Sequence, residues 1–430
     1  MASTIPSVKG TRDFYPEEMS FRRWLGKNIQ AVSEQFGYQE YDGPFLERID
    51  LYAAKSGEEL VKEQSFVFPD RGGDLIALRP ELTPSLARMV ASRRNLLPRT
   101  IRWWSFGPFW RYERPQKGRG REFFQWNIDL LGVDTPQADA EIAAIGAAFF
   151  QRVGLSPKQV RIKFNNRRLV DKQLGDLGVP AEQRGGIFHL VDRRDKMNAN
   201  AWEKYALELG LSSVQFSNLC LLLEQSDAWE ESEELTAFIK ALSDLGYDEY
   251  FEYDPTVIRG LDYYTGTVFE ARDAAGTLRA VLGGGRYDNL VADVGGDPVA
   301  GVGFAMGDMV LRVLLEEEGL IPSLRSNPAD ILLATFDESC WSAALALASD
   351  LRSNGLRVEW YPEATRISKQ LKYAGQQGMP FAIILGTDEI ESRTAAVKNL
   401  VTREQENVPF DRTAEFVLKQ LAGEKGSHPA

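Results

Sequence analysis

The segment 123–132 alternates between polar and apolar side chains over most of its length. Because successive side chains of a strand point to opposite faces, Phe123, Gln125, Asn127 and Asp129 are expected to share one face. Amide and carboxylate groups on one face could bind a polar substrate. The pattern therefore predicts a strand that forms the floor of a binding site.

The residues before this strand predict its partner in a hairpin. Arg111 and Glu113 alternate with aromatic residues, and the connection 114–122 holds Lys117, Arg119 and Arg121. Guanidinium groups can bind phosphate oxygens in a bidentate manner. An ordinary half-solvated hairpin is the alternative, but the basic tip favours a nucleotide site with RNA at its rim.

Composition limits the chemistry that other residues could supply. The chain has only two histidines, His189 and His428, which leaves little room for a histidine-based triad or metal cluster. Cys220 and Cys340 lack CxxC spacing, so we expect neither a zinc site nor a disulfide framework. No metal site built from protein ligands is predicted.

Charge and hydrophobicity indicate a large globular protein. The chain has 430 residues, 43% of them hydrophobic, and a net charge of −12, so we expect two or three domains and RNA contact only through local basic patches. It contains no apolar run of about 18 residues and begins without a secretory-signal pattern. We therefore expect a cytoplasmic protein without membrane partners.

Several elements must position the candidate site. The apolar spacing of 21–36 predicts a helix that begins near Pro16 and ends at Gly37. Residues 75–132 have a period of two and predict an antiparallel sheet. A helical module is expected within 165–255, strands at 257–271 and 278–282, and a strand leading into a helix at 302–315.

A charged, proline-containing stretch at 316–328 predicts a domain boundary. Beyond it, strand patterns at 331–336, 358–361 and 381–385 alternate with helical ones at 341–351 and 366–377, as in a small α/β domain. We therefore expect a domain at 1–325 with a helical insertion at about 168–252, a second domain at 326–423, and a disordered tail at 424–430.

Five blocks in one order resemble histidyl-tRNA synthetases over nearly the whole chain. The hairpin block, FWRYERPQKGR, resembles motif 2 of that family, and RGLDYYTG resembles its histidine-specific signature. The five blocks are residues 9–14 (KGTRDF), 78–84 (LRPELTP), 109–119 (FWRYERPQKGR), 259–266 (RGLDYYTG) and 283–288 (GGGRYD). The resemblance implies a class II α+β catalytic domain with a central antiparallel sheet, followed by an α/β anticodon-binding domain.

The resemblance also implies the activity. Such enzymes activate L-histidine with ATP to histidyl-adenylate and pyrophosphate, and transfer histidine to the 3′-terminal adenosine of tRNA(His). It implies that Arg111 contacts the α-phosphate of ATP and that Arg119 contacts the distal phosphates. Glu113 would bind the adenine amino group, and Phe123 would stack on adenine. Arg259 would assist the attack from the other side of the substrate, and a structural ion pair with Asp254 or Asp262 is its alternative.

The same resemblance implies a histidine pocket. Glu81 and Thr83 would bind the ammonium group, Gln125 would lie near the carboxylate, and Asp129 with Tyr264 would hydrogen-bond the imidazole. Tyr263 belongs to the same signature, and Tyr287 would support the pocket. A carboxylate and a phenol around an imidazole reject analogues that lack a ring nitrogen, because the polar groups of the site would be left unpaired.

One block departs from the family pattern. Residues 303–307 (GFAMG) fit motif 3, but Asp308-Met309-Val310 follows where an acidic residue and an arginine are usual. Arg312 is two residues away and is expected to point elsewhere on its helix. Arg119 or a bound Mg²⁺ would then carry more of the charge at the γ-phosphate.

Further matches concern partners. Arg114 and Gln116 match positions that read the 5′ nucleotide of tRNA(His), with solvated loop residues as the alternative. Pro44 resembles the motif 1 proline of the class II dimer interface, so a homodimer is expected. Residues 366–373 (RISKQLKY) form a predicted basic helix of the terminal domain that could contact RNA.

Two other classes of protein share this scaffold. One is a silent paralogue such as the regulatory subunit of ATP phosphoribosyltransferase, which binds histidine as an effector; such proteins usually lack the terminal domain and degrade the Arg259 block. The other is a nucleic-acid-binding accessory protein, which would not need Arg111, Glu113, Gln125 and Asp129. The motif 3 departure alone favours the paralogue.

Overall fold

The computed structural model describes residues 4–53, 64–194, 197–258 and 263–425. The chain forms two compact units, which we describe separately. The larger unit contains Trp24–Ile321 and the smaller one contains the residues from Pro322 onward, with Phe14–Arg23 assigned to the smaller unit. Within the described ranges, no helix is both long enough and apolar enough to cross a membrane.

The first helix, α1, runs over Pro16–Gln35 and confirms the predicted opening helix. Pro16 is tolerated at the first turn because a helix leaves its first N–H groups unbonded, and Glu17 favours the positive end of the helix dipole. Leu25, Ile29 and Val32 are buried along one stripe. The chain turns at Gly37 with a φ of 79°, a conformation that glycine adopts without strain.

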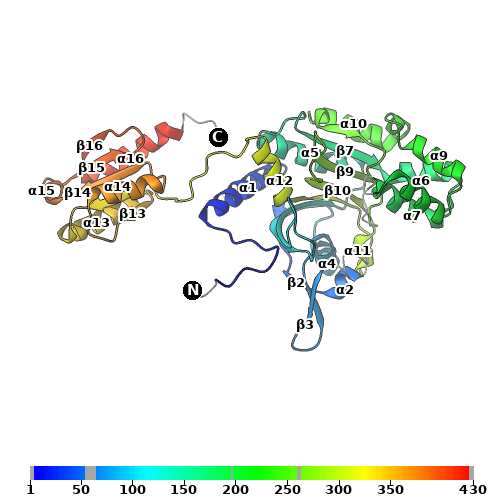
Figure 1. The fold of residues 1–430 in the computed structure, drawn as a ribbon, viewed down its shortest axis with the longest axis horizontal. Coiled ribbons are helices and arrows are strands. Elements are labelled where there is room, and N and C mark those ends of the chain that lie inside the picture. The colour runs from blue at the N-terminus through cyan, green and yellow to red at the C-terminus, as the bar shows by residue number, and fades with distance from the viewer. Residues whose placement is uncertain (1–3, 54–63, 195–196, 259–262, 426–430) are drawn as a thin grey trace. The chain divides into compact units, whose positions relative to one another are not determined.

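A mixed, mostly antiparallel eight-stranded sheet forms the centre of the larger unit (Figure 1). Its end pairs β1–β5 and β7–β8 are parallel, and the other pairs are antiparallel. In sheet order the strands are β1 (Gln39–Glu40), β5 (Ile101–Trp110), β6 (Glu122–Leu131), β11 (Gly301–Gly307), β10 (Leu282–Tyr287), β9 (Thr267–Asp273), β7 (Val160–Asn166) and β8 (Phe251–Tyr253).

The apolar face of this sheet is covered by α5, Pro136–Arg152. Thr135 caps the helix by accepting a hydrogen bond from Ala138 N at 3.3 Å. Trp126 of β6 is fully buried and meets the rings of Phe149 and Phe304. The apolar half of the alternation therefore faces the core, and the polar half is left for the opposite face.

A smaller three-stranded antiparallel sheet precedes the hairpin, in the order β2 (Leu46–Arg48), β4 (Leu75–Leu78) and β3 (Phe66–Pro69). The continuous sheet predicted over 75–132 is wrong in part, because α4, Thr83–Arg93, and a 3₁₀ turn, η1 at Arg94–Leu96, interrupt it. Pro84 at the start of the helix fixes a helical φ, and the buried Leu86 and Val90 hold it against the core. A short helix, α2 at Ile49–Ala53, packs near these elements.

Helices dominate the insertion that follows β7, and Figure 1 shows α6, α7 and α9 gathered at one end of the sheet beside β7 and β9. They have a core of their own that includes Leu174, Ile187, Leu190 and Trp202. The elements are α6 (Arg167–Asp176), α7 (Ala181–Asp192), α8 (Ala199–Glu208), α9 (Ser213–Leu222), η3 (Ala228–Glu231), α10 (Glu233–Asp244) and η4 (Asp248–Tyr250).

The strand predictions after the insertion need correction. β9 begins at Thr267 rather than near 257, and β10 begins at Leu282, so only the end of the predicted strand at 278–282 is extended. The predicted passage from strand to helix at 302–315 is confirmed by β11 and by α12, Asp308–Glu317. A one-turn helix, α11 at Leu290–Asp293, lies between β10 and β11.

The smaller unit is an α/β domain, as expected, but its sheet has five strands, because two strands follow the three that were predicted. Its core includes Ile331, Ile383, Leu347 and Val417. In sheet order the strands are β13 (Val358–Trp360), β12 (Ile331–Thr335), β14 (Phe381–Leu385), β15 (Thr394–Asn399) and β16 (Gln405–Pro409). The helical elements are η5 (Glu338–Cys340), α13 (Trp341–Ser353), α14 (Ile367–Gln376), α15 (Thr387–Glu391) and α16 (Phe410–Lys425).

Both cysteines are free, with Cys340 buried and Cys220 partly buried. Most of the predicted disordered tail, 424–430, lies outside the described residues, and α16 extends to Lys425.

Candidate active site

Arg111 follows β5 directly and is held on two sides. Its backbone N–H donates to the Arg121 carbonyl at 3.0 Å, which closes the base of the hairpin loop. Its Nε donates to the carbonyl of Pro80 at 3.0 Å, and the guanidinium carbon lies 5.2 Å from the centre of the Phe123 ring. The structure therefore brings Arg111, Phe123 and the 78–84 segment together.

The ring of Phe123 offers an aromatic surface on the hairpin and is supported by the buried ring of Phe109. The two rings are paired across β5 and β6 and are stacked with centroids 6.0 Å apart and an interplanar angle of 27°. Phe123 is half-buried. Such a surface suits a flat heteroaromatic ring such as a nucleobase.

Glu113 and Arg119 form an ion pair within the hairpin loop, although the sequence assigned them to opposite ends of ATP. The Glu113 side chain is nearly buried, and that of Arg119 is one-third exposed. A tight turn brings them close, because Gln116 and Arg119 exchange backbone hydrogen bonds around Gly118, whose φ is 71°. A nucleotide that contacted both side chains would have to replace this pair.

The polar face of β6 is buried and lies beside residues with little or no side chain. Gln125, Asn127 and Asp129 are at most 6% exposed, and Gln125 Nε2 donates to Asn127 Oδ1 at 2.8 Å. Directly opposite them on β11 stand Gly307, Ala305 and Gly303. On this face of the sheet, β6 therefore contributes polar side chains, and β11 contributes residues whose side chains are small or absent.

Gly303 is required by this arrangement. A Cβ at this position would collide with Asp129 Oδ1 and would lie 2.7 Å from the Ile128 carbonyl oxygen. Neither atom can move freely, because one belongs to the backbone of the sheet and the other to a buried side chain. The glycine thus makes room for the carboxylate.

Asp129 carries an unusual carboxyl group. Burial raises its pKa from 3.8 to about 7, although a hydrogen bond from Tyr287 opposes this rise. Tyr287 Oη donates to Asp129 Oδ1 at 2.5 Å, and burial together with the nearby carboxylate raises the pKa of the phenol well above its usual value. Tyr287 therefore keeps its proton and donates it in a hydrogen bond to Asp129 at the floor of the site.

Two further tyrosines, Tyr263 and Tyr264, pack in the same region as Tyr287, which donates to this carboxylate. Tyr263 lies 4.9 Å from Tyr264 and 6.1 Å from Tyr287, measured between ring centroids. Tyr264 and Tyr287 belong to one buried cluster, with Tyr263 packed against it. The three tyrosines that the sequence assigned to one pocket are thus brought together.

Tyr41 is a member of the site that the sequence did not reveal. Its ring lies 5.2 Å from that of Trp103, and its buried hydroxyl has no hydrogen-bond partner among the residues that the structure describes. Burial, and secondarily the charge of Asp129, raise the pKa of the phenol. Nothing in the local pattern around residue 41 marks it, since its relation to Asp129 depends on the pairing of β1 with β5.

The 78–84 segment places Glu81 and Thr83 at the start of α4. Glu81 is 6% exposed, and Thr83 is the first residue of the helix. Arg79, which the sequence gave no role, is fully buried, and its Nη1 donates to Asp42 Oδ1 at 2.5 Å. Its guanidinium carbon lies 4.5 Å and 4.6 Å from the ring centres of Phe45 and Phe109, so Arg79 fixes this segment against the hairpin.

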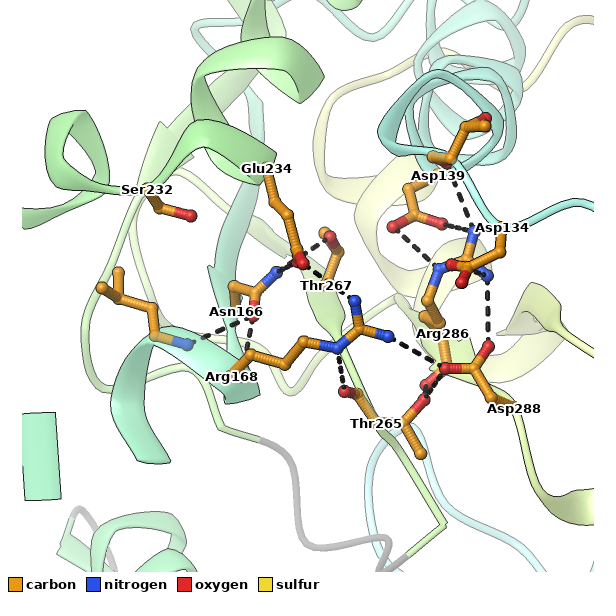
Figure 2. A network of polar contacts seen from close by, with 12 residues as sticks. Asp134, Asp139, Asn166, Arg168, Ser232, Glu234, Thr265, Thr267, Arg286 and Asp288 are labelled. Atoms are coloured by element: carbon orange, nitrogen blue, oxygen red, sulfur yellow. Dashed lines mark hydrogen bonds and ion pairs between the residues drawn. The ribbon is translucent and has the colours of Figure 1, made fainter. Parts of the chain in front are cut away.

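A network of charged and polar residues includes Arg286, the residue before Tyr287 in the sequence (Figure 2). Arg286 is 2% exposed and its Nη2 contacts Asp139 Oδ1 at 2.6 Å, while Nη1 contacts Asp288 Oδ1 at 3.2 Å. Burial raises the pKa of Asp139 to about 6 even with this arginine present. Asp288 Oδ2 also accepts from Thr265 Oγ1 at 2.6 Å and pairs with Arg168 at 3.1 Å. The network joins β10 to the start of the helical insertion.

Val310 occupies the position where the family usually has an arginine. A Cβ on Gly118 of the hairpin loop would lie 3.2 Å from Val310 Cγ2, so the valine borders that loop. Arg312 instead pairs with Glu316 on its own helix, between Nε and Oε1 at 2.8 Å. Asp308 accepts from Phe124 N at 2.9 Å and pairs with Arg12 at 2.8 Å.

The remaining predicted residues divide into two groups. Arg114 and Gln116 are exposed on the hairpin loop. Arg259 lies outside the described residues. Among the residues that the structure describes, no group of three or more His, Cys, Asp or Glu side chains could hold a metal ion.

Two family models match the chain. One, described as histidyl-tRNA synthetase, matches residues 10–309, and the other, described as an anticodon binding domain, matches residues 330–420. The chain is 34% identical to a histidine–tRNA ligase of Leptospira biflexa over 97% of this chain and 98% of that protein. It is 36% identical to one of Opitutus terrae, over 96% and 98%.

Solved structures agree with this fold. Histidyl-tRNA synthetase from Nostoc sp. PCC 7120 superposes with a TM-score of 0.82 at 24% identity, covering 97% of this chain and 100% of that one. The apo enzyme of S. aureus superposes with a TM-score of 0.70 at 26% identity, covering 96% and 100%.

Proposed function

The chain belongs to the histidyl-tRNA synthetase family and acts as a histidine–tRNA ligase, and from this we propose how its residues share the work of activating histidine. The reaction joins a carboxylate to the α-phosphate of ATP and releases pyrophosphate. The protein must therefore align both reactants and stabilise negative charge at phosphorus.

Arg111 is our candidate for the α-phosphate, because its guanidinium is held by Pro80 and lies beside Phe123. Phe123 would stack on adenine, Glu113 would accept from the adenine amino group, and Arg119 would bind the distal phosphates. ATP would thus separate the Glu113–Arg119 ion pair. Arg119 would exchange a carboxylate for phosphate oxygens, and Glu113 would accept a hydrogen bond from the neutral adenine amine.

Arg259 remains our candidate for the second cation at the α-phosphate. Two guanidinium groups on opposite sides of the phosphorus would stabilise the charge that builds during attack. Mg²⁺ would enter with ATP, because this ion is commonly bound through substrate phosphates rather than by a dedicated protein cage. Bound in this way, Mg²⁺ would neutralise phosphate charge near Val310.

The histidine pocket is the part of the proposal that the geometry supports best. We assign the imidazole to Asp129 and Tyr264, with Tyr263 and Tyr287 supporting them. The carrying observation is the buried carboxylate of Asp129, which accepts from Tyr287 over a floor opened by Gly303. Glu81 and Thr83 would take the ammonium group, and Gln125 would lie by the carboxylate.

Asp129→Asn tests this assignment in histidine-dependent ATP–pyrophosphate exchange. The amide keeps the shape but loses the charge, so we expect the KM for histidine to rise about 10- to 100-fold. The KM for ATP should change less than about threefold. A matched control is Asp273→Asn, a buried carboxylate of the same sheet that accepts from Thr277 N and Leu278 N.

Asp273→Asn should lower the free energy of unfolding while leaving the histidine KM unchanged. An Asp129→Asn enzyme with the wild-type histidine KM would exclude this carboxylate from the pocket.

We assign Arg114 and Gln116 to tRNA(His), because both are exposed at the rim of the nucleotide site. Replacing both with alanine should weaken binding of tRNA(His) in filter-binding assays and leave pyrophosphate exchange intact. We propose domain limits of 1–325 and 326–423, with the insertion at about 168–252. The second domain would bind the anticodon.

A homodimer is proposed from exposed apolar side chains near Pro44. Phe45, Leu46, Phe68 and Leu75 are each more than 40% exposed on and beside the three-stranded sheet. Sedimentation equilibrium would test the dimer, and a monomer at micromolar concentration would contradict it. We place the enzyme in the cytoplasm, although one relative, 36% identical, is a chloroplastic/mitochondrial enzyme of Arabidopsis thaliana.

A further inference from the structure

The junction between β7 and α6 contains four consecutive polar residues, 165–168, which we name the α6 clasp. Asn166 is the N-cap of α6, where its Oδ1 accepts from Arg168 N at 2.8 Å and from Leu169 N at 3.3 Å. This cap satisfies helix N–H groups that would otherwise lack partners. The cap therefore fixes the backbone from which the side chains of Arg167 and Arg168 extend.

The α6 clasp donates hydrogen bonds to the backbone of segment 255–266. Arg167 Nη1 donates to the Tyr264 carbonyl at 3.0 Å and Nε donates to the Ile258 carbonyl at 3.3 Å. Three more donors of the clasp reach the carbonyls of Pro255 (from Asn165 Nδ2, 3.0 Å), Thr265 (from Arg168 Nε, 3.1 Å) and Gly266 (from Arg167 N, 2.9 Å). One short turn thus holds five carbonyl groups.

Arg167 differs from its neighbour Arg168 in its surroundings. Arg167 is 8% exposed, and its guanidinium carbon lies 5.0 Å from the ring centre of Phe188 on α7. The side chain of Arg168 is 46% exposed and pairs with Glu234 and Asp288, as Figure 2 shows. Charge contacts in solvent contribute little, so Arg167 is the stronger constraint on the backbone.

The two carbonyls that Arg167 binds belong to different cores. The side chain of Ile258 is buried in the core of the helical insertion, with Leu174 and Trp202. The side chain of Tyr264 is buried in the cluster that contains Tyr287. A planar guanidinium holds its donors in a fixed fork that can reach both carbonyls at a set spacing, whereas the three donors of an ammonium group all lie on one nitrogen.

We propose that Arg167 is a positioning residue for histidine recognition, which fixes the backbone of Tyr264 and so sets the tyrosine cluster beside Asp129. The inference rests on the proposed histidine pocket. Arg167 Nη1 donates to the main-chain carbonyl of Tyr264, so its contact with this tyrosine is through the backbone. Its effect on catalysis is exerted through the placement of that tyrosine.

The test is Arg167→Lys in the full-length enzyme, measured by histidine-dependent pyrophosphate exchange. Lysine keeps the charge but loses the fork, and a cavity of about 710 Å³ lined by Arg167, Phe188 and Tyr264 lets water reach the shorter cation. We expect the KM for histidine to rise about tenfold, which is ~1.4 kcal/mol. The KM for ATP should stay within about twofold of wild type.

The matched control is Arg184→Lys, an arginine of α7 in the same insertion. Its Nε donates to the Val179 carbonyl at 3.1 Å and its Nη1 pairs with Asp171 at 2.7 Å, and both partners belong to the helical insertion. Its replacement should lower the thermal midpoint as much as Arg167→Lys does, without a change in the histidine KM. A merely structural role of Arg167 would make the two variants alike.

A second variant covers the case in which Arg167→Lys does not fold. Phe188→Leu removes the ring beside the guanidinium and should raise the histidine KM by a smaller factor, about threefold. A wild-type histidine KM in whichever variant folds, or equal rises in the two KM values, overturns the inference. Asp129→Asn distinguishes this result from a wrong pocket assignment. If the pocket is assigned correctly, that variant raises the histidine KM even when Arg167 has no positioning role.

Discussion

The carboxyl group of Asp129 couples the chemistry of the site to the stability of the protein. In the folded state burial raises its pKa to about 7 from 3.8. Between these pH values the folded protein keeps the proton and the unfolded chain releases it. The free energy of unfolding therefore falls as pH rises through this window, and the contribution is constant above it.

Comparing wild type with Asp129→Asn by urea denaturation isolates this effect. Between about pH 4 and 7 the wild-type protein should lose roughly 1.4 kcal/mol of unfolding free energy per pH unit relative to the variant. A difference that is independent of pH would show that Asp129 ionises normally in the folded protein.

Gly303 provides a second test at the level of single residues. Gly303→Ala places a methyl group against Asp129 Oδ1, so it should cost about 1–3 kcal/mol of stability and most of the exchange activity. Gly307→Ala on the same strand meets no atom within 4 Å, and as an N-cap change it should cost no more than about 1 kcal/mol. Equal losses from both changes, measured by thermal unfolding, would contradict the close fit at Gly303.

Sequence patterns predicted the residues whose chemistry is local to one strand or block. Alternation placed Gln125 and Asp129 on one face of β6, and that face is buried in the structure. Arg79 and Tyr41 were not predicted. Arg79 pairs with Asp42 and Tyr41 lies near Asp129, and both relations depend on sheet pairing and loop closure. A single sequence carries no periodic signal for such contacts.

At the scale of elements, helix signals were more reliable than strand limits. The opening helix and the two predicted helices of the terminal domain, α13 and α14, agree with the predictions to within a few residues, whereas α15 and α16 were not predicted. α4 was missed because its buried, apolar residues resemble a continuation of the strands around it. β9 was placed too early because Val257 and Ile258 are buried without being extended in a ladder.

The start of α12 yields a prediction about motif 3. Val310 borders Gly118 of the hairpin loop, whose Arg119 is assigned to the distal phosphates. Val310→Arg would add a cation beside those phosphates, so we expect the KM for ATP to fall about three- to tenfold. The KM for histidine should not change. A raised KM for ATP in steady-state exchange would show that the valine is needed to pack the loop.

At the scale of the whole molecule, histidine activation and anticodon recognition are assigned to different units. Residues 10–309 match the synthetase family and residues 330–420 match the anticodon-binding family. The charged, proline-containing stretch at 316–328 and the α/β alternation beyond it predicted a second domain. The exact limits of the two units were not predictable, because contacts assign Phe14–Arg23 to the smaller one.

Truncation after Leu320 tests this division of labour. The shortened enzyme should catalyse histidine-dependent exchange within about tenfold of wild type, because every described residue assigned to the site precedes the cut. Charging of tRNA(His) should fall at least about 100-fold, since contacts with the anticodon arm are lost. Normal charging by the truncated enzyme would require another role for the terminal domain.

The central claim is a histidine-specific adenylate site built on β6, and exchange of labelled pyrophosphate into ATP, measured with each of the twenty amino acids in turn, tests it most directly. We predict that histidine alone supports exchange. Exchange with a different amino acid, or none with histidine at saturating ATP, would contradict it.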